Sequence, residues 1–185
     1  MLVIIGGPPG SGNTSRSRRL ARDRGWPVLG SDDLARTIAG SAGLKDGDAY
    51  WIAYDVAFAM AEEWLSLGVS AVLDINPGWT FQWQQVDALR QHHPLAKIVP
   101  IVLPCSRQTC LERIDRRHMA DPSVFDPPRR FRTDPRILAV FDCGEAIDAS
   151  RAMLVDAQRT DDEVYATVAR LVAANWPKEA GVRRG

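Results

Sequence analysis

Lysine is nearly absent from this sequence of 185 residues. It stands only at Lys45, Lys97 and Lys178, while the other twenty positive charges are arginines. The 23 basic and 23 acidic side chains cancel to a formal net charge of zero. This balance argues against nucleic-acid binding through bulk positive charge, although it is compatible with a local basic groove.

Cysteine and long apolar runs are also scarce. Cys105, Cys110 and Cys143 form no CxxC pair, so neither a disulfide framework nor a zinc site is expected. Such thiols suit a reducing compartment, and we expect the protein in the cytoplasm. No apolar run approaches ~20 residues, the length that spans a bilayer. The N-terminus lacks the charged and long apolar regions of a signal peptide. The sequence therefore predicts no membrane partner.

Short apolar runs alternate with helical stretches along the chain. Strands are expected at 2–5, 27–29, 69–75, 96–103 and 151–155, and helices at 14–24, 48–67, 80–92, 106–118 and 161–174. This alternation predicts an α/β fold with a mostly parallel sheet. We expect a single domain over residues 1–177, with an irregular excursion at 120–136, and a flexible tail at 178–185.

Three local features follow from the same patterns. Helix 48–67 is apolar on most sides, so we expect it to be well buried, with Trp51 packed in the core. Helix 14–24 is expected to carry a basic outer face that includes Arg16. Ser31 resembles an N-cap residue, followed by two acids where the helix dipole favours negative charge.

The sharpest motif is a glycine-rich turn between the first strand and the first helix. Residues 7–14 read GPPGSGNT and match G-x-x-x-x-G-x-[ST]. Glycines let backbone amides turn toward a phosphate, and the helix N-terminus adds a favourable dipole. The predicted phosphate-binding residues are Gly7, Gly10, Ser11, Gly12, Asn13, Thr14 and Ser15. The Thr14 hydroxyl is also placed to bind Mg²⁺. A glycine-rich turn without a ligand is the alternative.

Asn13 stands where this motif has lysine. Asparagine can donate a neutral hydrogen bond but supplies no charge to a phosphoryl group in transfer. Loss of one preorganised donor costs roughly 10²–10³ in rate. An arginine such as Arg16 or Arg113 could replace the lysine, the protein could bind nucleotide without efficient turnover, or the chain could be a single substitution of an active kinase. The sequence leaves all three open.

Acidic residues follow two of the predicted strands. Asp32 and Asp33 come after the second strand, and Asp74 ends the third. Ligands of open parallel sheets bind beyond the carboxyl ends of the strands. One carboxylate there can accept the proton of an attacking hydroxyl, and another can hold Mg²⁺. Helix capping and a strand-end turn are the alternatives for these acids.

Arginines gather in the second half of the chain. Eight lie between Arg107 and Arg136, and Arg113 and Arg117 share one helix face at i and i+4. Arginines on a mobile cover can bring charge to a phosphoryl transition state when the cover closes. A solvated, ion-paired helix face is the alternative. Trp79 follows the strand-end Asp74 and could stack on an aromatic substrate or a base, although packing is the simpler interpretation.

In this order, the motifs resemble those of small P-loop kinases. They are residues 7–14, Ser31-Asp32-Asp33-Leu34, Asp74-Ile-Asn76 and Leu111-x-Arg113-x-x-x-Arg117. Over about residues 1–175 the chain is similar to the kinase domain of polynucleotide 5′-kinases and to the AAA-type predicted-kinase group. It is more distantly similar to chloramphenicol phosphotransferase and zeta toxins. The resemblance implies a P-loop NTPase three-layer sandwich with a mostly parallel five-stranded sheet and a lid at about 106–136.

The resemblance also implies roles for single residues. Asp32 resembles the base that activates the acceptor hydroxyl, and Asp74 resembles the acid near Mg²⁺. Arg113 and Arg117 resemble lid arginines on the donor phosphates. The remaining candidates are Gln158 and Arg159 beside adenine, and Asp33, Arg36 and Trp79 beside the substrate. Ala35 stands where the polynucleotide kinases have a substrate-binding arginine.

The sequence therefore predicts a kinase. MgATP would donate its γ-phosphoryl group to a hydroxyl of a small molecule or of a nucleic-acid 5′ end. One alternative is a nucleotide-binding pseudokinase that lacks efficient turnover because Asn13 replaces the lysine. Another is a switch that hydrolyses ATP or GTP, although no guanine-recognition motif supports the GTP version.

Overall fold

The computed structural model describes residues 1–44, 46–76, 78–122, 127–145 and 150–176, so the predicted tail at 178–185 lies outside the described residues. Helices and strands alternate as predicted. Their order is β1 (Leu2–Gly6), α1 (Asn13–Arg24), β2 (Val28–Gly30), α2 (Ser31–Ala42), α3 (Asp46–Ser66), β3 (Ala71–Asp74), α4 (Thr80–His92), β4 (Ile98–Val102), α5 (Arg107–Ala120), α6 (Arg130–Thr133), α7 (Pro135–Glu145), β5 (Met153–Leu154) and α8 (Asp161–Ala174).

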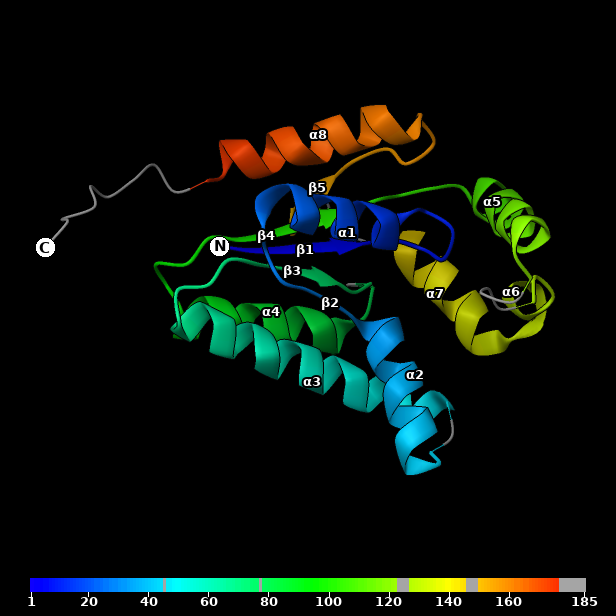
Figure 1. Ribbon diagram of the computed structural model, residues 1–185, viewed down its shortest axis with the longest axis horizontal. Helices are drawn as coiled ribbons and strands as arrows, with labels where there is room; N and C mark the ends of the chain where they lie inside the picture. Colours follow the sequence, from blue (N-terminus) through cyan, green and yellow to red (C-terminus); the bar gives the residue numbers. More distant parts are fainter. Residues whose placement is uncertain (45, 77, 123–126, 146–149, 177–185) are drawn as a thin grey trace, which may run out of the picture.

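The strands form one five-stranded sheet in the order β2-β3-β1-β4-β5, and every pair in it is parallel. Successive residues of β1 point to opposite faces. Val3 and Ile5 pack with Leu20 on one face, and Leu2 and Ile4 pack with residues of α3 and α4 on the other. The α1 and α8 helices cover the first face, and α3 and α4 cover the second (Figure 1). The predicted three-layer α/β sandwich is confirmed.

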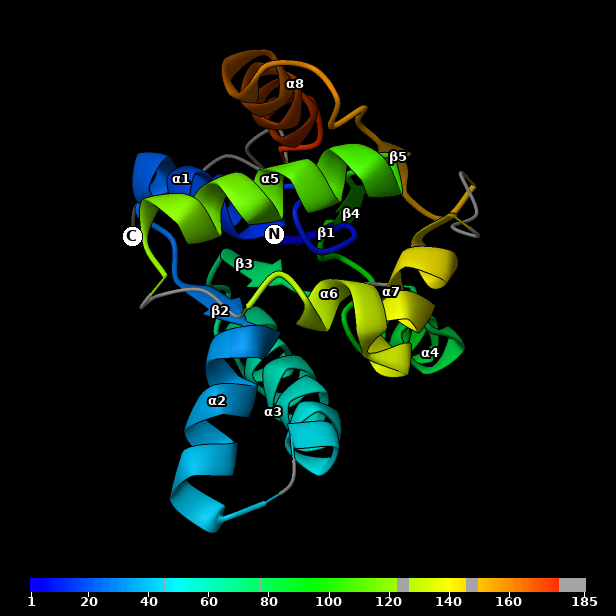
Figure 2. The same cartoon turned by 90° about the vertical axis from the view of Figure 1, so that its right-hand side faces the viewer.

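The carboxyl ends of the strands all point toward the same edge of the sheet (Figure 1). The phosphate-loop turn, α2, α5, α6 and α7 gather around this edge (Figure 2). Parallel strands joined by right-handed crossovers place every strand-to-helix turn there, which makes this edge the ligand-binding one. Residues distant in sequence meet at this single position.

Several expectations about local structure were wrong. The excursion predicted at 120–136 is partly helical, because α6 and the start of α7 lie within it. Helix α3 is not well buried on all sides: Trp51, Ile52, Val56 and Met60 are exposed, with 52% of Trp51 accessible. Its buried face is a stripe of alanines at every fourth position from 49 to 61, so larger apolar side chains are left outside. Among the described residues, no helix is long and apolar enough to cross a bilayer.

Two helix starts also differ from expectation. Arg16 does not lie on an outer face of α1, because its side chain is buried with 2% exposed. The N-cap of α2 is Gly30 rather than Ser31, and Gly30 has no side chain with which to cap. Asp32 and Asp33 nevertheless lie in the first turn of α2, where the helix dipole favours acids.

Candidate active site

The phosphate loop, residues 7–14, turns tightly between β1 and α1. Gly10 and Gly12 have φ angles of 87° and 88°, which residues other than glycine rarely adopt. A Cβ atom on Gly10 would lie 2.5 Å from the Cys110 carbonyl oxygen, and one on Gly12 would lie 2.1 Å from Arg16 Nη1. The motif glycines are therefore required by both backbone conformation and close packing.

Asn13 connects this loop to the sheet. Its Nδ2 donates a 2.8 Å hydrogen bond to Oδ1 of Asp74, and its Oδ1 accepts from the Ser11 hydroxyl at 3.3 Å. The side chain at the lysine position thus contacts the strand-end acid of β3. The predicted metal pair meets here too, because Thr14 also hydrogen-bonds with Asp74.

Asp74 is buried, with 7% of its surface exposed. Its pKa is raised to about 6: burial raises it most and the negative charge of Asp32 adds to this, whereas interactions with Thr14 and Asn13 lower it. The electrostatic effect also shows that Asp32 and Asp74 are neighbours. The hydroxyl and the carboxylate lie together and offer oxygen ligands that suit Mg²⁺. This ion is usually bound by one or two protein oxygens together with phosphates and water. Thr14 and Asp74 therefore fit this ion.

Asp33 is held by two arginines. Arg18 Nη2 lies 2.7 Å from Asp33 Oδ2, and Arg36 Nη2 lies 2.5 Å from Asp33 Oδ1. Partial burial raises the pKa of Asp33, but the hydrogen bonds from Arg36 and Arg18 outweigh it and leave the pKa below its usual range. The predicted substrate residues Asp33 and Arg36 are thus paired with each other. A Cβ on Gly30 would lie 3.5 Å from oxygens of both Asp33 and Asp74, which places all these acids at one strand edge.

The two arginines considered as lysine substitutes are both engaged elsewhere. Arg16 Nη1 donates to the Ser11 carbonyl at 2.6 Å, and its Nη2 lies 3.0 Å from Asp161 on α8. Arg113 Nη2 donates to the Ala157 carbonyl at 2.8 Å, and its Nη1 contacts Cys105 Sγ at 3.8 Å.

Arg113 therefore joins α5 to the 156–160 segment that follows β5. In this segment the backbone N–H of Gln158 donates to Asp156 Oδ1 at 2.9 Å. Arg159 follows in the sequence and is exposed. Arg117 lies one turn after Arg113 on α5, and burial lowers its pKa. Arg113, Gln158 and Arg159 thus belong to the half of the edge formed by β1, β4 and β5, and Arg117 is carried by the same helix as Arg113.

Cys105 lies beside Arg113, on the same half of the edge. Hydrogen bonding with the Cys110 thiol and the positive charge of Arg113 lower the pKa of Cys105 to about 7, against the opposing effect of burial. The pKa of Cys110 is raised by the same hydrogen bond and by burial.

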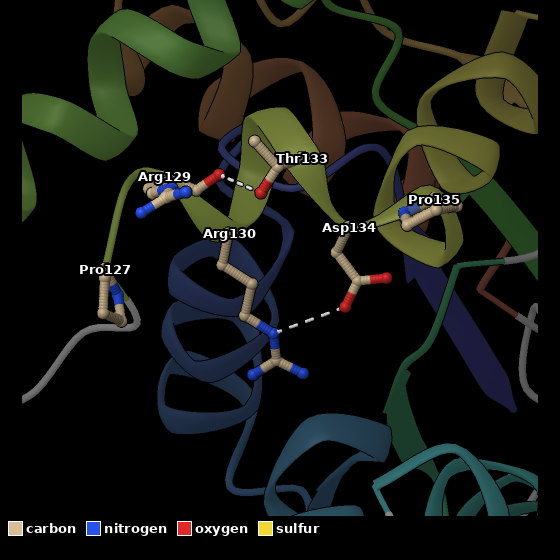
Figure 3. Close-up of a pocket in the computed structure, with 6 residues that line it drawn as sticks. All are labelled: Pro127, Arg129, Arg130, Thr133, Asp134 and Pro135. Atoms are coloured by element: carbon tan, nitrogen blue, oxygen red, sulfur yellow. Dashed lines mark hydrogen bonds and ion pairs between the residues drawn. The ribbon is translucent and has the colours of Figure 1, made fainter.

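The predicted lid segment carries a cavity of about 670 Å³ around α6 (Figure 3). It is lined by Pro127, Arg129, Arg130, Thr133, Asp134 and Pro135. Arg130 Nε lies 3.8 Å from Asp134 Oδ2, and Arg132 joins α6 to Asp115 on α5 at 2.7 Å. The sequence placed Arg129 and Arg130 in an arginine-rich segment, but singled out neither one. They lie at the cavity because α6 forms there, whereas the four prolines of 120–136 had favoured an irregular segment.

Aromatic side chains lie on the other half of the edge. Trp79, a predicted substrate residue, is half-buried, and its ring centroid is 6.5 Å from that of Trp51. Tyr54 and Phe81 complete the group, with ring centroids 5.6 Å apart. Sequence reasoning missed Tyr54 and Trp51 as site residues. Their i, i+3 spacing on one helix was the available signal.

Comparison with known proteins gives a consistent family assignment. A family model described as an AAA domain matches residues 2–133. Solved structures with the same fold include a candidate kinase from Chloroflexus aurantiacus j-10-fl (18% identity, 94% of this chain and 96% of that one, TM-score 0.69). A sugar kinase from Janibacter sp. HTCC2649 has 16% identity, coverage of 93% and 94%, and a TM-score of 0.66. A gluconokinase from Sinorhizobium meliloti 1021 has 23% identity, coverage of 93% for both chains, and a TM-score of 0.57. None of the curated proteins matches the sequence.

Proposed function

The chain belongs to this AAA domain family of P-loop kinase-like proteins, and from that premise we propose that it transfers the γ-phosphoryl group of ATP to a hydroxyl of a small molecule. One observation carries the proposal. Asn13 and Thr14 of the phosphate loop both contact Asp74, and Asp74 neighbours Asp32. The residues that we assign to phosphate, to the metal and to the base therefore share one strand edge.

The donor would bind along the β1 side of this edge. Backbone amides of the phosphate loop, with Ser15 at the start of α1, would receive the phosphates, and Gln158 and Arg159 would border adenine. Arg113 and Arg117 would lie near the donor phosphates. Thr14 and Asp74 would hold Mg²⁺, which supplies charge neutralisation between the β- and γ-phosphates.

The acceptor would bind beside Asp32. Its hydroxyl oxygen attacks the γ-phosphorus, the bond to the β–γ bridging oxygen breaks, and ADP leaves. Asp32 accepts the hydroxyl proton. Two of the similar structures are named for small-molecule acceptors, a sugar and gluconate, which supports a small molecule over a nucleic-acid 5′ end. The zero net charge favours the same choice. We place this reaction in the cytoplasm, on the ground of the sparse, unpaired cysteines.

A second candidate is a nucleotide-binding pseudokinase. Asn13 is neutral, and the guanidinium groups of Arg16 and Arg113 are occupied by carbonyl oxygens and Asp161. A site built in this way would bind ATP and transfer its phosphoryl group slowly.

Transfer of labelled γ-phosphate to a panel of hydroxyl compounds tests the proposal. Asp32→Asn should lower transfer roughly 10²–10⁴-fold, because it removes the general base. The increase in Tm caused by MgATP should be unchanged in that variant. Asp55→Asn, which changes an exposed acid of α3, is the matched control and should retain full transfer.

The possible outcomes separate the two candidates. Equal transfer by wild type and Asp32→Asn would refute the assigned base. Stabilisation by MgATP without transfer to any acceptor would favour the pseudokinase. Absence of stabilisation by both MgATP and MgADP would refute both functions.

A further inference from the structure

Four aromatic rings meet on the α3–α4 side of the strand edge. Trp51 and Tyr54 come from α3, Trp79 precedes α4, and Phe81 lies in its first turn. The centroid of Trp51 is 5.1 Å from that of Phe81 and 6.5 Å from those of both Tyr54 and Trp79. All these pairs are tilted or edge-on rather than stacked face to face. Trp51 is 52% exposed in spite of these contacts.

Tyr54 connects this aromatic group to the proposed base. Its hydroxyl interacts with the side chain of Ser31, which immediately precedes Asp32. Burial, together with the negative charge of Asp32, raises the pKa of Tyr54 to about 12. Tyr54 therefore lies close to Asp32 as a neutral phenol. The helices α3 and α4 lie on the face of the sheet opposite α1 and α8 (Figure 1).

Asn76 supplies a polar group in the segment between β3 and Trp79. It lies two residues after Asp74, and only 9% of it is exposed. Within the described part of the chain, neither its Nδ2 nor its Oδ1 has a hydrogen-bond partner. A buried amide without partners is costly for the fold, so its retention calls for a ligand that can both accept and donate a hydrogen bond. A hydroxyl group does both.

The charges at this position select against an anion. The carboxylates of Asp32, Asp33 and Asp74 share the edge, and Arg18 and Arg36 beside them are both paired with Asp33. Among the described residues, an anionic acceptor would therefore meet this negative charge beside two arginines that already have a carboxylate partner. A neutral acceptor with a flat face has both an aromatic surface and an amide to bind.

We propose that Trp51, Trp79 and Asn76 form an acceptor subsite beside Asp32 for a neutral, hydroxyl-bearing ring compound. The flat face of the ring packs on the tryptophans, and a hydroxyl bonds to the Asn76 amide. This inference rests on the proposed kinase function. The ring can belong to a sugar or to an aryl alcohol, since both offer a flat apolar face and a polar edge.

Binding measurements test the subsite without requiring turnover. Glucose and 1-phenylethane-1,2-diol are the ring probes, and sorbitol and gluconate are the open-chain probes. Each is titrated calorimetrically into the full chain saturated with MgADP, and again without nucleotide. At least one ring probe should bind at least tenfold more tightly than sorbitol, and gluconate should bind most weakly. Which ring probe binds more tightly distinguishes a sugar from an aryl source.

Two variants locate the binding. Trp51→Ala and Asn76→Leu should each weaken binding of the ring probe about tenfold. Asn76→Leu should keep or raise the Tm, because it removes an unpartnered buried amide, whereas a purely structural role would lower the Tm and leave the Kd unchanged. Trp176→Ala is the matched control: this tryptophan is 43% exposed but stacks on Trp26, and its loss should leave binding unchanged.

Failure of the subsite is distinct from failure of the kinase. Absence of binding by both ring probes, preference for gluconate, or unchanged affinity in both variants would overturn the subsite. Ring binding that depends on Trp51 and Asn76, without phosphoryl transfer, would support the subsite and contradict the kinase.

Discussion

The two halves of the strand edge are built in different ways. On the proposed donor half, which comprises the phosphate loop, α5 and the 156–160 segment, polar groups bind one another or the neighbouring end of β3: Asn13 to Asp74, Arg16 to Ser11, and Arg113 to the Ala157 carbonyl. On the acceptor half, aromatic rings are partly exposed, and the Asn76 amide has no partner among the described residues. Internal hydrogen bonds fix the shape of the phosphate loop. On the other half, the proposed acceptor half, part of the Trp51 ring stays exposed and the Asn76 amide stays without a partner among the described residues.

This difference matches what each half would bind. A triphosphate is the same in every ATP-dependent kinase, so a fixed loop of backbone amides serves it and leaves a motif in the sequence. An acceptor differs from one enzyme to another and is recognised by side chains brought together by the fold. The comparison of the halves can therefore be tested by variants that change only one of them.

Asn13→Lys is expected to have the largest effect. It adds a cation that can reach the β- and γ-phosphates, and should raise the rate of phosphoryl transfer roughly 10²–10³-fold. The KM for the acceptor should not change, because the substitution lies on the donor half. Asn13→Met is the control measured in the same assay, because the methionine side chain is similar in length to lysine and carries no charge. A comparable gain in the transfer rate of the methionine variant would show that the gain does not depend on a positive charge at position 13.

Gly10→Ala should disturb the donor half by a smaller amount. Its Cβ would lie 2.5 Å from the Cys110 carbonyl oxygen, at a φ of 87°. Gly25→Ala is the matched control, since φ is 66° and no atom lies within 4 Å of the added Cβ. The backbone cost alone is about 1–2 kcal/mol, so Gly25→Ala should lose that much free energy of unfolding and Gly10→Ala clearly more.

Urea unfolding measures both losses, and MgADP titration measures the consequence for binding. Gly10→Ala should also bind MgADP more weakly, because the clash pushes α5 from the loop, while Gly25→Ala should bind normally. Equal free energies of unfolding for the two variants would contradict the packing of the loop against α5.

Cys105 alkylation should show the smallest effect. With its pKa near 7, about half of this thiol is ionised at pH 7, against a few per cent of an ordinary thiol. Lower nucleophilicity offsets part of this gain, so iodoacetamide should react about threefold faster with Cys105 than with an unperturbed thiol at pH 7. The advantage should disappear above pH 9, where both thiols are ionised. Arg113→Leu should reduce it, and a pH profile without inflection near 7 would count against the assigned environment.

Much of the fold and the donor half could be predicted from the sequence. The helices 80–92 and 161–174 have the predicted bounds, and Thr14 meets Asp74 as the motif implied. Short-range patterns determine these features: glycine spacing, strand ends and helix periodicity.

The remaining features depend on contacts between segments far apart in the chain. Arg16 is buried, and it pairs with Asp161, 145 residues away. Trp51 is exposed although most of its helix is apolar, since only the fold decides which face of α3 meets the sheet. Asn76 belongs to a motif that the sequence displayed, but its lack of a partner is visible only once its neighbours are in place.

The position of a bound ATP analogue tests the central claim most directly. A crystal structure with Mg²⁺ and a non-hydrolysable analogue should place the triphosphate on residues 7–14 and the ion at Thr14 and Asp74. The γ-phosphate should face Asp32, and the Trp51–Trp79 side should remain free for the acceptor. A triphosphate bound elsewhere, or an adenine ring stacked among Trp51, Tyr54 and Trp79, would contradict the division of the edge into donor and acceptor halves.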